Sequence, residues 1–367
     1  MDKTFYDVLR VFLLNKAFLL LVSILAVTFL PLGLGYRINT PSMLNPWAQW
    51  DGEAYLTIAE KGYVTLSDGR TLYNFLPAYP LIIRLTGFIV QDLALAALLL
   101  SAAFSLMASY YLFRIAELEF GEDVAKKTVV LLLFFPTAFF FSAVYSESMF
   151  LALVTASFYY ARKGDWIKAG VLAAALPFVR ILGLLFWIVL AIEYLLQNRK
   201  LVFNKRFVGV SIAVLGVVAF FIYSMLTTDS LFGYANQQNL WTRAISSPHV
   251  ALLNALELIL VRGPVLAAYS VWNLSILVFF VATLYYAFTR MRKSYSVYMF
   301  LMMILPLLSS TLEGLSRFIL ICFPSFMIMA MLLDKNKLYL PVVALSAMLL
   351  VILTARFVTG AVETVFG

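Results

Sequence analysis

The chain has little of the side-chain chemistry that soluble enzymes use most often. Its 367 residues include one cysteine, Cys322, and one histidine, His249. A single cysteine excludes an internal disulfide. With a single histidine, neither a His-based metal site nor a Ser-His-Asp triad is expected. No Walker loop occurs in the sequence, so ATP-driven pumping by this chain alone is not expected.

Charged residues are also scarce. They make up 13% of the chain and hydrophobic residues 63%, whereas soluble domains average about 25% and about 45–50%. Apolar runs long enough for about 30 Å of hydrocarbon recur along the sequence. These features predict an integral membrane protein. The net charge of +8 is then explained by Lys and Arg gathered on the cytoplasmic side, and no nucleic-acid partner is expected.

The apolar runs predict an all-α, polytopic single domain over residues 1–367, with about eleven spans. They are placed at 17–35, 93–113, 127–144, 148–162, 167–180, 181–197, 207–227, 265–289, 295–312, 316–333 and 338–357. The first run is too long for a signal peptide and is expected to be a retained span. The segment 76–90 is short and carries Arg84, which favours a helix in the membrane interface over a crossing.

The charges give this arrangement an orientation. With the N-terminus inside and 76–90 kept outside, two of every three of the 27 Lys and Arg residues lie on inner segments. Counting 76–90 as a crossing would put the basic segments 199–206 and 290–293 outside, against the positive-inside rule. The C-terminus is therefore expected outside, and two outer segments are large: 36–92, with interfacial helices, and 228–264.

The first outer loop contains a candidate base. From Glu53 onward, Tyr55, Ile58 and Ala59 recur at helical spacing, which predicts a short amphipathic helix on the membrane surface. Asp51 would stand at the start of this helix. Its carboxylate can cap the helix, or it can act as a general base held among aromatic residues at the lipid boundary.

A second candidate acid and two arginines lie on the same side. Glu147 is expected between two spans, where it either suits the positive end of a helix or performs a task that justifies a carboxylate next to hydrocarbon. Arg180 and Arg317 either extend to the interface or hold an anionic group such as a phosphate. Glu313 is an alternative ion-pair partner for Arg317.

Six short motifs follow one another between residues 46 and 325. They are Trp50-Asp51-x-x-x-Tyr55-x-x-Ile58-Ala59-x-x-Gly62-Tyr63, Phe75-Leu76-Pro77-Ala78-Tyr79-Pro80, Phe141-Ser142-Ala143-x-Tyr145-Ser146-Glu147-Ser148, Arg180-x-x-Gly183, Gln238-x-x-Trp241-x-Arg243 and Ser316-Arg317-Phe318. In this order the chain resembles the PIG-V-like mannosyltransferases, relatives of GPI mannosyltransferase 2 in the GT-C class of polyprenyl-phosphate-sugar glycosyltransferases. Gln49 and Asn74 depart from that family's pattern, where arginine and a small residue are usual.

The resemblance implies a GT-C fold and an inverting glycosyl transfer. A polyprenyl or dolichyl phosphate would carry the sugar, most simply mannose, and the acceptor would be a hydroxyl of a lipid- or protein-linked glycan on the outer face. Asp51 would be the catalytic base, and Glu147 would orient a sugar or act as a second acid. The donor phosphate would be held by Arg180, Arg317 and Arg243. Substrate-binding roles would fall to Trp50, Tyr55, Tyr145, Gln238 and Trp241.

The sequence leaves alternatives for the metal cofactor, for the membrane in which the protein resides and for the class of membrane protein. No dedicated metal site is expected, although a divalent cation (Mg²⁺ or Mn²⁺) between Asp51 and Glu147 would fit some members of the class. The compact chain favours the plasma membrane of a bacterium or archaeon, or the endoplasmic reticulum in a eukaryote. A transporter or flippase for a phosphate-bearing lipid is the main alternative, and an envelope-glycan polymerase or ligase is another. Transporters place ionisable groups near the bilayer midplane, whereas the candidates here gather on one side.

Overall fold

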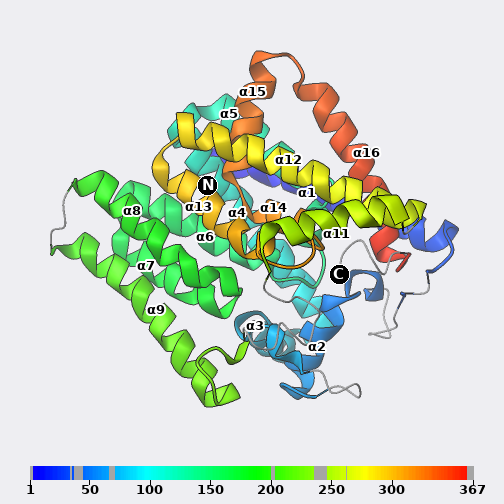
Figure 1. The fold of residues 1–367 in the computed structure, drawn as a ribbon, viewed down its shortest axis with the longest axis horizontal. Helices are drawn as coiled ribbons and strands as arrows, with labels where there is room; N and C mark the ends of the chain where they lie inside the picture. The colour runs from blue at the N-terminus through cyan, green and yellow to red at the C-terminus, as the bar shows by residue number, and fades with distance from the viewer. Residues whose placement is uncertain are drawn as a thin grey trace. The chain divides into compact units, whose positions relative to one another are not determined.

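A computed structural model describes residues 3–33, 35–36, 44–65, 71–199, 203–234, 246–261 and 263–361 (Figure 1). The described residues fold into helices, and their only β-type pairing is an isolated bridge between Thr65 and Thr71. The expectation of an all-α fold is therefore confirmed. The chain divides into two compact units. Unit 1 comprises 1–60, 79–159 and 323–367, and unit 2 comprises 61–78 and 160–322. That the whole chain forms one domain remains a prediction.

Unit 1 contains eight of the described α-helices. They are α1 (Lys3–Phe29), α2 (Asp51–Lys61, whose last residue lies in unit 2), α3 (Ala78–Val90, whose first residue does), α4 (Leu93–Phe120), α5 (Glu122–Leu133), α6 (Glu147–Lys163, whose last turn enters unit 2), α15 (Pro324–Lys335) and α16 (Tyr339–Val358). Two 3₁₀ turns, η1 (Asn45–Trp47) and η3 (Ala138–Phe141), belong to the same unit.

Unit 2 contains the other described helices. They are α7 (Trp166–Ala175), α8 (Phe186–Asn198), α9 (Lys205–Thr228), α11 (Pro248–Val261), α12 (Pro264–Arg290), α13 (Lys293–Leu307) and α14 (Leu315–Ile321), with the 3₁₀ turns η2 (Leu72–Asn74), η4 (Leu176–Phe178) and η5 (Ile181–Leu185).

The multi-pass character is confirmed, but the count of eleven spans is not. Among the described residues, six helices are long and apolar enough to cross a membrane, or seven if α14 and α15 form one broken span. Several expected spans are interrupted at prolines, which cannot donate a helical hydrogen bond and disfavour helix at the preceding residue. The run 127–144 stops being α-helical at Leu133, before Pro136, and 167–180 stops at Ala175, before Pro177. The run 316–333 is divided at Pro324, the first residue of α15.

The segment 76–90 forms α3, whose 13 residues extend over about 20 Å and are too short to cross the hydrocarbon. The amphipathic helix predicted near Glu53 is α2. Tyr55, Ile58 and Ala59 are buried on one side of it, while Glu53 is exposed. Both results agree with the layout predicted for the first outer loop.

In unit 1, α1 and α5 lie side by side and run in the same direction. The pair is joined near its start by an ion pair between Lys126 and Asp7 at 3.3 Å. Near its end, the amide of Asn15 donates to the carbonyl of Leu133 at 2.7 Å. The turns of residues 134–146 follow α5, and Lys16 on α1 donates hydrogen bonds to two of their residues. These turns and the first two residues of α6 contain the Phe141–Ser148 motif.

In unit 2, small residues let α7 and α9 pack backbone against backbone (Figure 1). A Cβ atom on Gly170 would lie 2.0 Å from the carbonyl oxygen of Gly209, and one on Gly209 would lie 2.1 Å from that of Trp166. A Cβ on Gly216 would lie 2.4 Å from the Cα of Ala174. Close approach through small residues is a common way for helices to associate in lipid, where packing replaces the hydrophobic effect.

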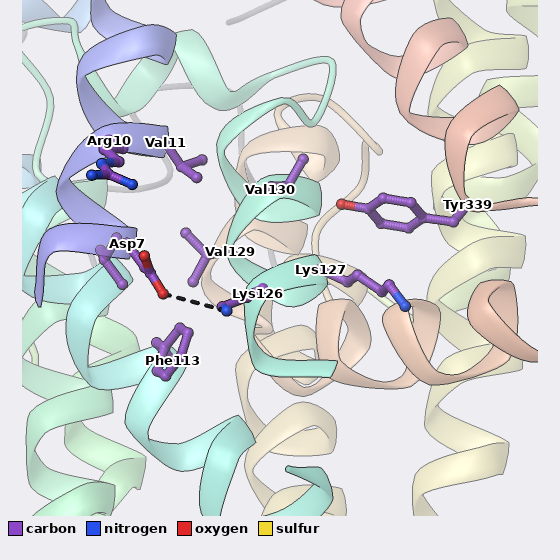
Figure 2. A pocket seen from close by; sticks show the side chains of 10 residues that line it. Asp7, Arg10, Val11, Phe113, Lys126, Lys127, Val129, Val130 and Tyr339 are labelled. Carbon is purple, nitrogen blue, oxygen red and sulfur yellow. Dashed lines mark ion pairs between the residues drawn. The ribbon is translucent and has the colours of Figure 1, made fainter. Parts of the chain in front are cut away.

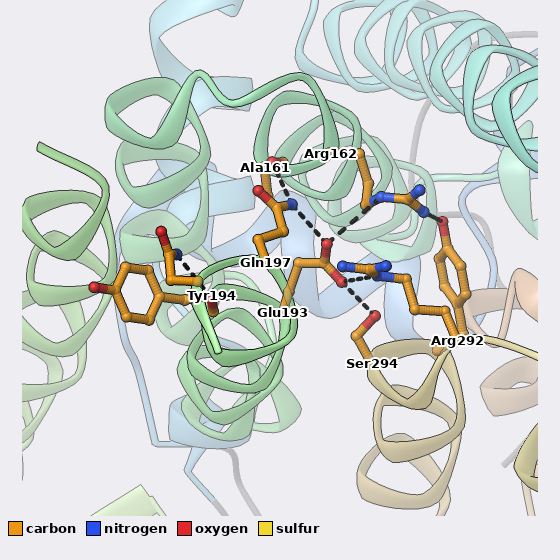
Figure 3. Close-up of polar contacts among 9 residues, drawn as sticks. Ala161, Arg162, Glu193, Tyr194, Gln197, Arg292 and Ser294 are labelled. Carbon is orange, nitrogen blue, oxygen red and sulfur yellow. Dashed lines mark hydrogen bonds and ion pairs between the residues drawn. The ribbon is translucent and has the colours of Figure 1, made fainter. Parts of the chain in front are cut away.

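A polar cluster around Glu193 joins α8, α13 and the last turn of α6 within unit 2 (Figure 3). The Glu193 side chain, on α8, is fully buried. Its Oε2 atom lies 2.7 Å from Arg292 Nε and accepts a hydrogen bond from Ser294 Oγ at 2.7 Å. Its Oε1 atom accepts from Gln197 at 2.7 Å and lies 3.5 Å from the Nε of Arg162, at the end of α6. The carboxylate is thus surrounded by donors.

Candidate active site

Asp51 is the first residue of α2, and its side chain is partly exposed. It shares the first turn with Glu53, where negative charge suits the positive end of the helix dipole. The residue before it, Trp50, has a φ of 60°. That left-handed backbone conformation is uncommon for residues other than glycine, and such conformations cluster at functional sites. A helix-end position and a role as a base are therefore both compatible with the geometry at Asp51.

The backbone before Asp51 is attached to the Phe141–Ser148 motif. The amide of Val144 donates to the carbonyl of Trp47 at 3.0 Å. The hydroxyl of Tyr145 donates to the carbonyl of Gln49 at 3.3 Å. Gln49 is fully buried and donates from its own side chain to the carbonyl of Asn45 at 2.9 Å. Two motifs separated by about 90 residues of sequence are thus joined within unit 1.

A second set of contacts holds the body of α2 on the same motif. The hydroxyls of Tyr55 and Ser146 are 2.9 Å apart. The ring of Tyr55 packs edge-on against that of Tyr79, with centroids 5.0 Å apart. Tyr79 shares a hydrogen bond of 2.7 Å with Ser101, and Ser101 donates to the carbonyl of Ala143 at 2.8 Å. Tyr79, from the Phe75–Pro80 motif, therefore connects α2, α4 and the Phe141–Ser148 motif.

Glu147 is the first residue of α6 and is fully buried, as are its neighbours Ser146 and Ser148. Burial raises the pKa of the Tyr79 phenol, and the charge of Glu147 raises it further, while the hydrogen bond with Ser101 acts the other way. Tyr79 is therefore a neutral hydroxyl at physiological pH. Asp51 and Glu147 each begin a helix, and the segments that lead into these helices are hydrogen-bonded to each other.

Lys16 is a residue of this region that the sequence did not identify. Its ammonium donates to the Oγ atom of Ser142 at 2.6 Å and to the carbonyl of Phe141 at 3.1 Å. The sequence placed Lys16 at the inner end of the first span. In the structure α1 begins at Lys3, so Lys16 lies near the middle of the helix. A lysine near the middle of a span is costly unless it has polar partners, and these contacts supply them.

Arg180 lies between η4 and η5 in extended backbone. Its Cζ atom is 5.4 Å from the centre of the Phe318 ring, a cation–π distance. A Cβ atom on Gly183 would lie 2.2 Å from the backbone of Leu176, so only glycine permits the two turns to meet. The spacing Arg180-x-x-Gly183 therefore has a structural reason, which is that glycine allows the fold that presents the arginine.

Arg317 is 6% exposed, and its neighbour Ser316 is fully buried. Both are in α14, which also carries Phe318. The contact between Arg180 and Phe318 brings Arg180 against the Ser316–Phe318 motif within unit 2. The two motifs that the sequence connected with phosphate binding are therefore neighbours.

The candidates fall in two groups, one in each unit. Asp51, Glu147, Trp50, Tyr55 and Tyr145 belong to unit 1, and Arg180 and Arg317 to unit 2. Gln238, Trp241 and Arg243 lie outside the described residues, and their roles remain predictions.

A metal site is not assembled in the described part of the chain. No group of three or more His, Cys, Asp or Glu side chains comes together there. Asp51 and Glu147 alone would leave most ligand positions of Mg²⁺ or Mn²⁺ to water or substrate. A divalent cation between them remains a prediction, and the steps proposed below use the chain's own side chains.

Comparison with known proteins identifies the family. Residues 37–234 match the family described as Mannosyltransferase (PIG-V), and the chain belongs to that family. No curated protein matches the chain. Among solved structures, the chain is similar to ArnT from Cupriavidus metallidurans bound to undecaprenyl phosphate, with a TM-score of 0.55 and 12% identity over 95% of this chain and 76% of that one.

An Archaeoglobus fulgidus oligosaccharyltransferase, in complex with Zn and sulfate, is a more distant likeness. Its TM-score is 0.44 at 11% identity, over 95% of this chain and 53% of the other. The likeness to ArnT supports the GT-C fold that the motifs implied. As a member of the mannosyltransferase family with several apolar helices long enough to cross a membrane, the protein is a multi-pass membrane glycosyltransferase.

Proposed function

We propose that the enzyme transfers a sugar, most simply mannose, from a polyprenyl- or dolichyl-phosphate donor to a hydroxyl of a lipid- or protein-linked glycan on the outer face of the membrane. The observation that carries this proposal is the attachment of the Trp50–Asp51 segment to the Phe141–Ser148 motif through Trp47, Gln49 and Tyr55. This attachment fixes the start of α2, where Asp51 is partly exposed, against the start of α6, where Glu147 is buried.

In the proposed reaction Asp51 is the general base. The acceptor oxygen forms a bond to the anomeric carbon while the bond between that carbon and the donor phosphate breaks. The acceptor proton passes to the Asp51 carboxylate, and the lipid phosphate leaves with the bonding electron pair. Attack from the face opposite the phosphate inverts the anomeric configuration. Base catalysis of this kind contributes about 10²–10⁴-fold to a rate.

The leaving phosphate is already a good leaving group, so it needs positive charge more than a proton. Arg180 and Arg317 are the described residues proposed for this role, together with Arg243. A guanidinium suits a phosphate because its planar fork can donate two parallel hydrogen bonds. The ring of Phe318 packs against the Arg180 guanidinium and restricts its orientation.

Within the described residues of unit 1, Trp50 has a free hydrogen-bond donor that could contact a sugar. Its indole Nε1 is buried and has no hydrogen-bond acceptor in the described part of the chain. A buried donor without a partner is rare in native structures and calls for an explanation. A sugar hydroxyl would supply the missing acceptor. Tyr55 and Tyr145 use their hydroxyls within unit 1, which favours positioning of the motif, and their substrate-binding role remains a prediction.

The proposed class of sugar donor is supported by one solved structure of another protein. ArnT, which shares the fold, binds undecaprenyl phosphate in its solved structure. We extend that class of lipid to this chain, and we place the enzyme in the plasma membrane of a bacterium or archaeon, or in the endoplasmic reticulum if the source is eukaryotic.

The test uses the purified full chain with polyprenyl-phosphate-mannose and a glycolipid acceptor pool from the source membrane. Asp51→Asn is expected to lower the transfer rate at least about 100-fold. Glu53→Gln is the matched control, since Glu53 shares the first turn of α2 but is exposed. A product with retained anomeric configuration would contradict the proposed mechanism, and so would an Asp51→Asn rate equal to that of the control.

A further inference from the structure

A pocket of about 320 Å³ lies in unit 1, among α1, α4, α5 and the start of α16 (Figure 2). None of the candidate active-site residues lines it. Its walls are mostly apolar and come from Val8, Val11, Phe113, Val129 and Val130. Its polar lining comes from Asp7, Arg10, Lys126, Lys127 and Tyr339. Figure 2 shows the Tyr339 hydroxyl directed toward Val130, on the pocket side of its helix.

The position of the pocket along α1 sets its depth in the membrane. The 27 residues of α1 extend over about 40 Å, whereas the hydrocarbon core is about 30 Å thick. The first turns of α1, from Lys3 to Arg10, therefore lie at or near the head-group layer. The orientation predicted from the Lys and Arg distribution makes this the cytoplasmic side, where anionic lipids attract basic segments.

The basic residues of the pocket differ in whether they form ion pairs. Lys126 is paired with Asp7 at 3.3 Å and with Glu122 at 2.7 Å. Lys127 is paired with Asp334, and its ammonium also lies 5.8 Å from the centre of the Tyr339 ring. Arg10 is exposed and forms no ion pair within the described part of the chain. Arg10 is therefore the cation of this pocket that remains available to an anion.

We propose that this pocket binds an anionic glycerophospholipid of the cytoplasmic leaflet. The lipid phosphate would be held by the Arg10 guanidinium. One acyl chain would lie against the valines and Phe113. The cationic edge of the pocket, at head-group depth, suits the lipid phosphate. The apolar wall suits the acyl chain. Basic pockets between spanning helices are used in this way by membrane proteins.

The pocket is distinct from the Phe141–Ser148 motif of unit 1. Arg10 precedes Lys16 on α1 by six residues, or about 9 Å along the helix axis, in the direction away from the Phe141–Ser148 motif. The proposal does not depend on the reaction that the enzyme performs. It can therefore be tested by binding alone.

The experiment measures binding to the purified full chain by native mass spectrometry after delipidation in detergent. The probes are phosphatidylglycerol, phosphatidylcholine and inorganic phosphate. One phosphatidylglycerol is expected to be retained per chain, in preference to phosphatidylcholine and without competition from millimolar inorganic phosphate. Equal retention of the two lipids would overturn the role of Arg10, and displacement by inorganic phosphate would overturn the role of the apolar wall.

Two variants locate the site. Arg10→Gln is expected to weaken phosphatidylglycerol binding about fivefold, the effect of one basic residue at the membrane surface. Lys163→Gln is the matched control, because it removes the same charge from an exposed residue at the end of α6, on the same predicted face. Val130→Trp fills the pocket and is expected to abolish the preference for phosphatidylglycerol while the chain stays folded by circular dichroism. Unchanged binding in Arg10→Gln and Val130→Trp would overturn the proposal.

Discussion

The carboxylate of Glu193 is fully buried in unit 2 and contacts four side chains, whereas the carboxylate of Asp51 lies partly exposed at the start of α2 in unit 1. Two arginines and two neutral donors surround the carboxylate of Glu193. The segments on either side of Asp51 are hydrogen-bonded to the Phe141–Ser148 motif, and the Asp51 side chain is partly exposed. Burial with a full set of donors indicates a structural role, while exposure on a fixed backbone suits proton transfer.

The largest stability effect is expected at Glu193. Glu193→Gln removes the charge that compensates Arg162 and Arg292, and breaking a buried ion pair from one side costs about 3–5 kcal/mol. The midpoint of thermal unfolding in detergent should fall by about 5–10 °C. Glu53→Gln, on the exposed side of α2, should leave the midpoint unchanged. Equal midpoints for the two variants would mean that the Glu193 cluster does not stabilise unit 2.

Arg180 is a residue proposed to act in the reaction, in contrast to the structural role of Glu193. Arg180→Gln removes the charge and keeps a polar side chain, so transfer should slow about 100-fold through loss of phosphate stabilisation. Arg84→Gln is the control, because Arg84 is exposed on α3. Arg180→Lys should recover part of the rate, since a lysine supplies the charge without the planar fork. If both glutamine variants slow transfer equally, Arg180 has no special role at the phosphate.

The smallest effect on stability is expected at Asp165. Its carboxylate differs from those of Glu193 and Asp51 because it is exposed and paired with a lysine. It caps the start of α7, and its side chain lies 2.7 Å from the ammonium of Lys168. The hydrogen bond from Lys168 holds the pKa of Asp165 below its ordinary value. A carboxyl whose pKa is lowered by folding stabilises the fold above its unfolded pKa of about 3.9, and the contribution is lost as the pH falls through the folded pKa.

The pair between Asp165 and Lys168 is exposed, so Asp165→Asn should lower the unfolding midpoint by only about 1–2 °C at pH 7. The midpoints of the variant and the wild type should converge as the pH falls through the lowered pKa of Asp165 in the folded state. A difference that persists at low pH would show that the ion pair is not its source.

The sequence predicted some features well because they depend on local spacing. The apolar positions of α2 recur at helical intervals, and the length of α3 alone argues against a crossing. The spans around Pro136, Pro177 and Pro324 were predicted as continuous helices, because hydrophobicity does not report where prolines and turns divide a buried run. Length and hydropathy therefore gave the class of protein, while the count of eleven spans is not confirmed.

The candidate site could be predicted only as separate motifs. The family resemblance named Asp51 and Glu147, but the hydrogen bonds that join their segments depend on tertiary contacts about 90 residues apart in sequence. Lys16 was placed at the inner end of a span because the polar start of α1 was expected to lie outside the helix. The reason for Gly183 likewise appears only when the distance to Leu176 is known.

The measurement that separates the two carboxylates most directly compares Asp51→Asn with Glu193→Gln, each assayed for transfer rate and for unfolding midpoint. Asp51→Asn should lose at least about 100-fold in rate with a midpoint within about 2 °C of the wild type. Glu193→Gln should show the reverse, with a lowered midpoint and a rate within about tenfold of the wild type at a temperature where it is folded. An Asp51→Asn enzyme that keeps the wild-type rate would contradict the assignment of Asp51 as the base.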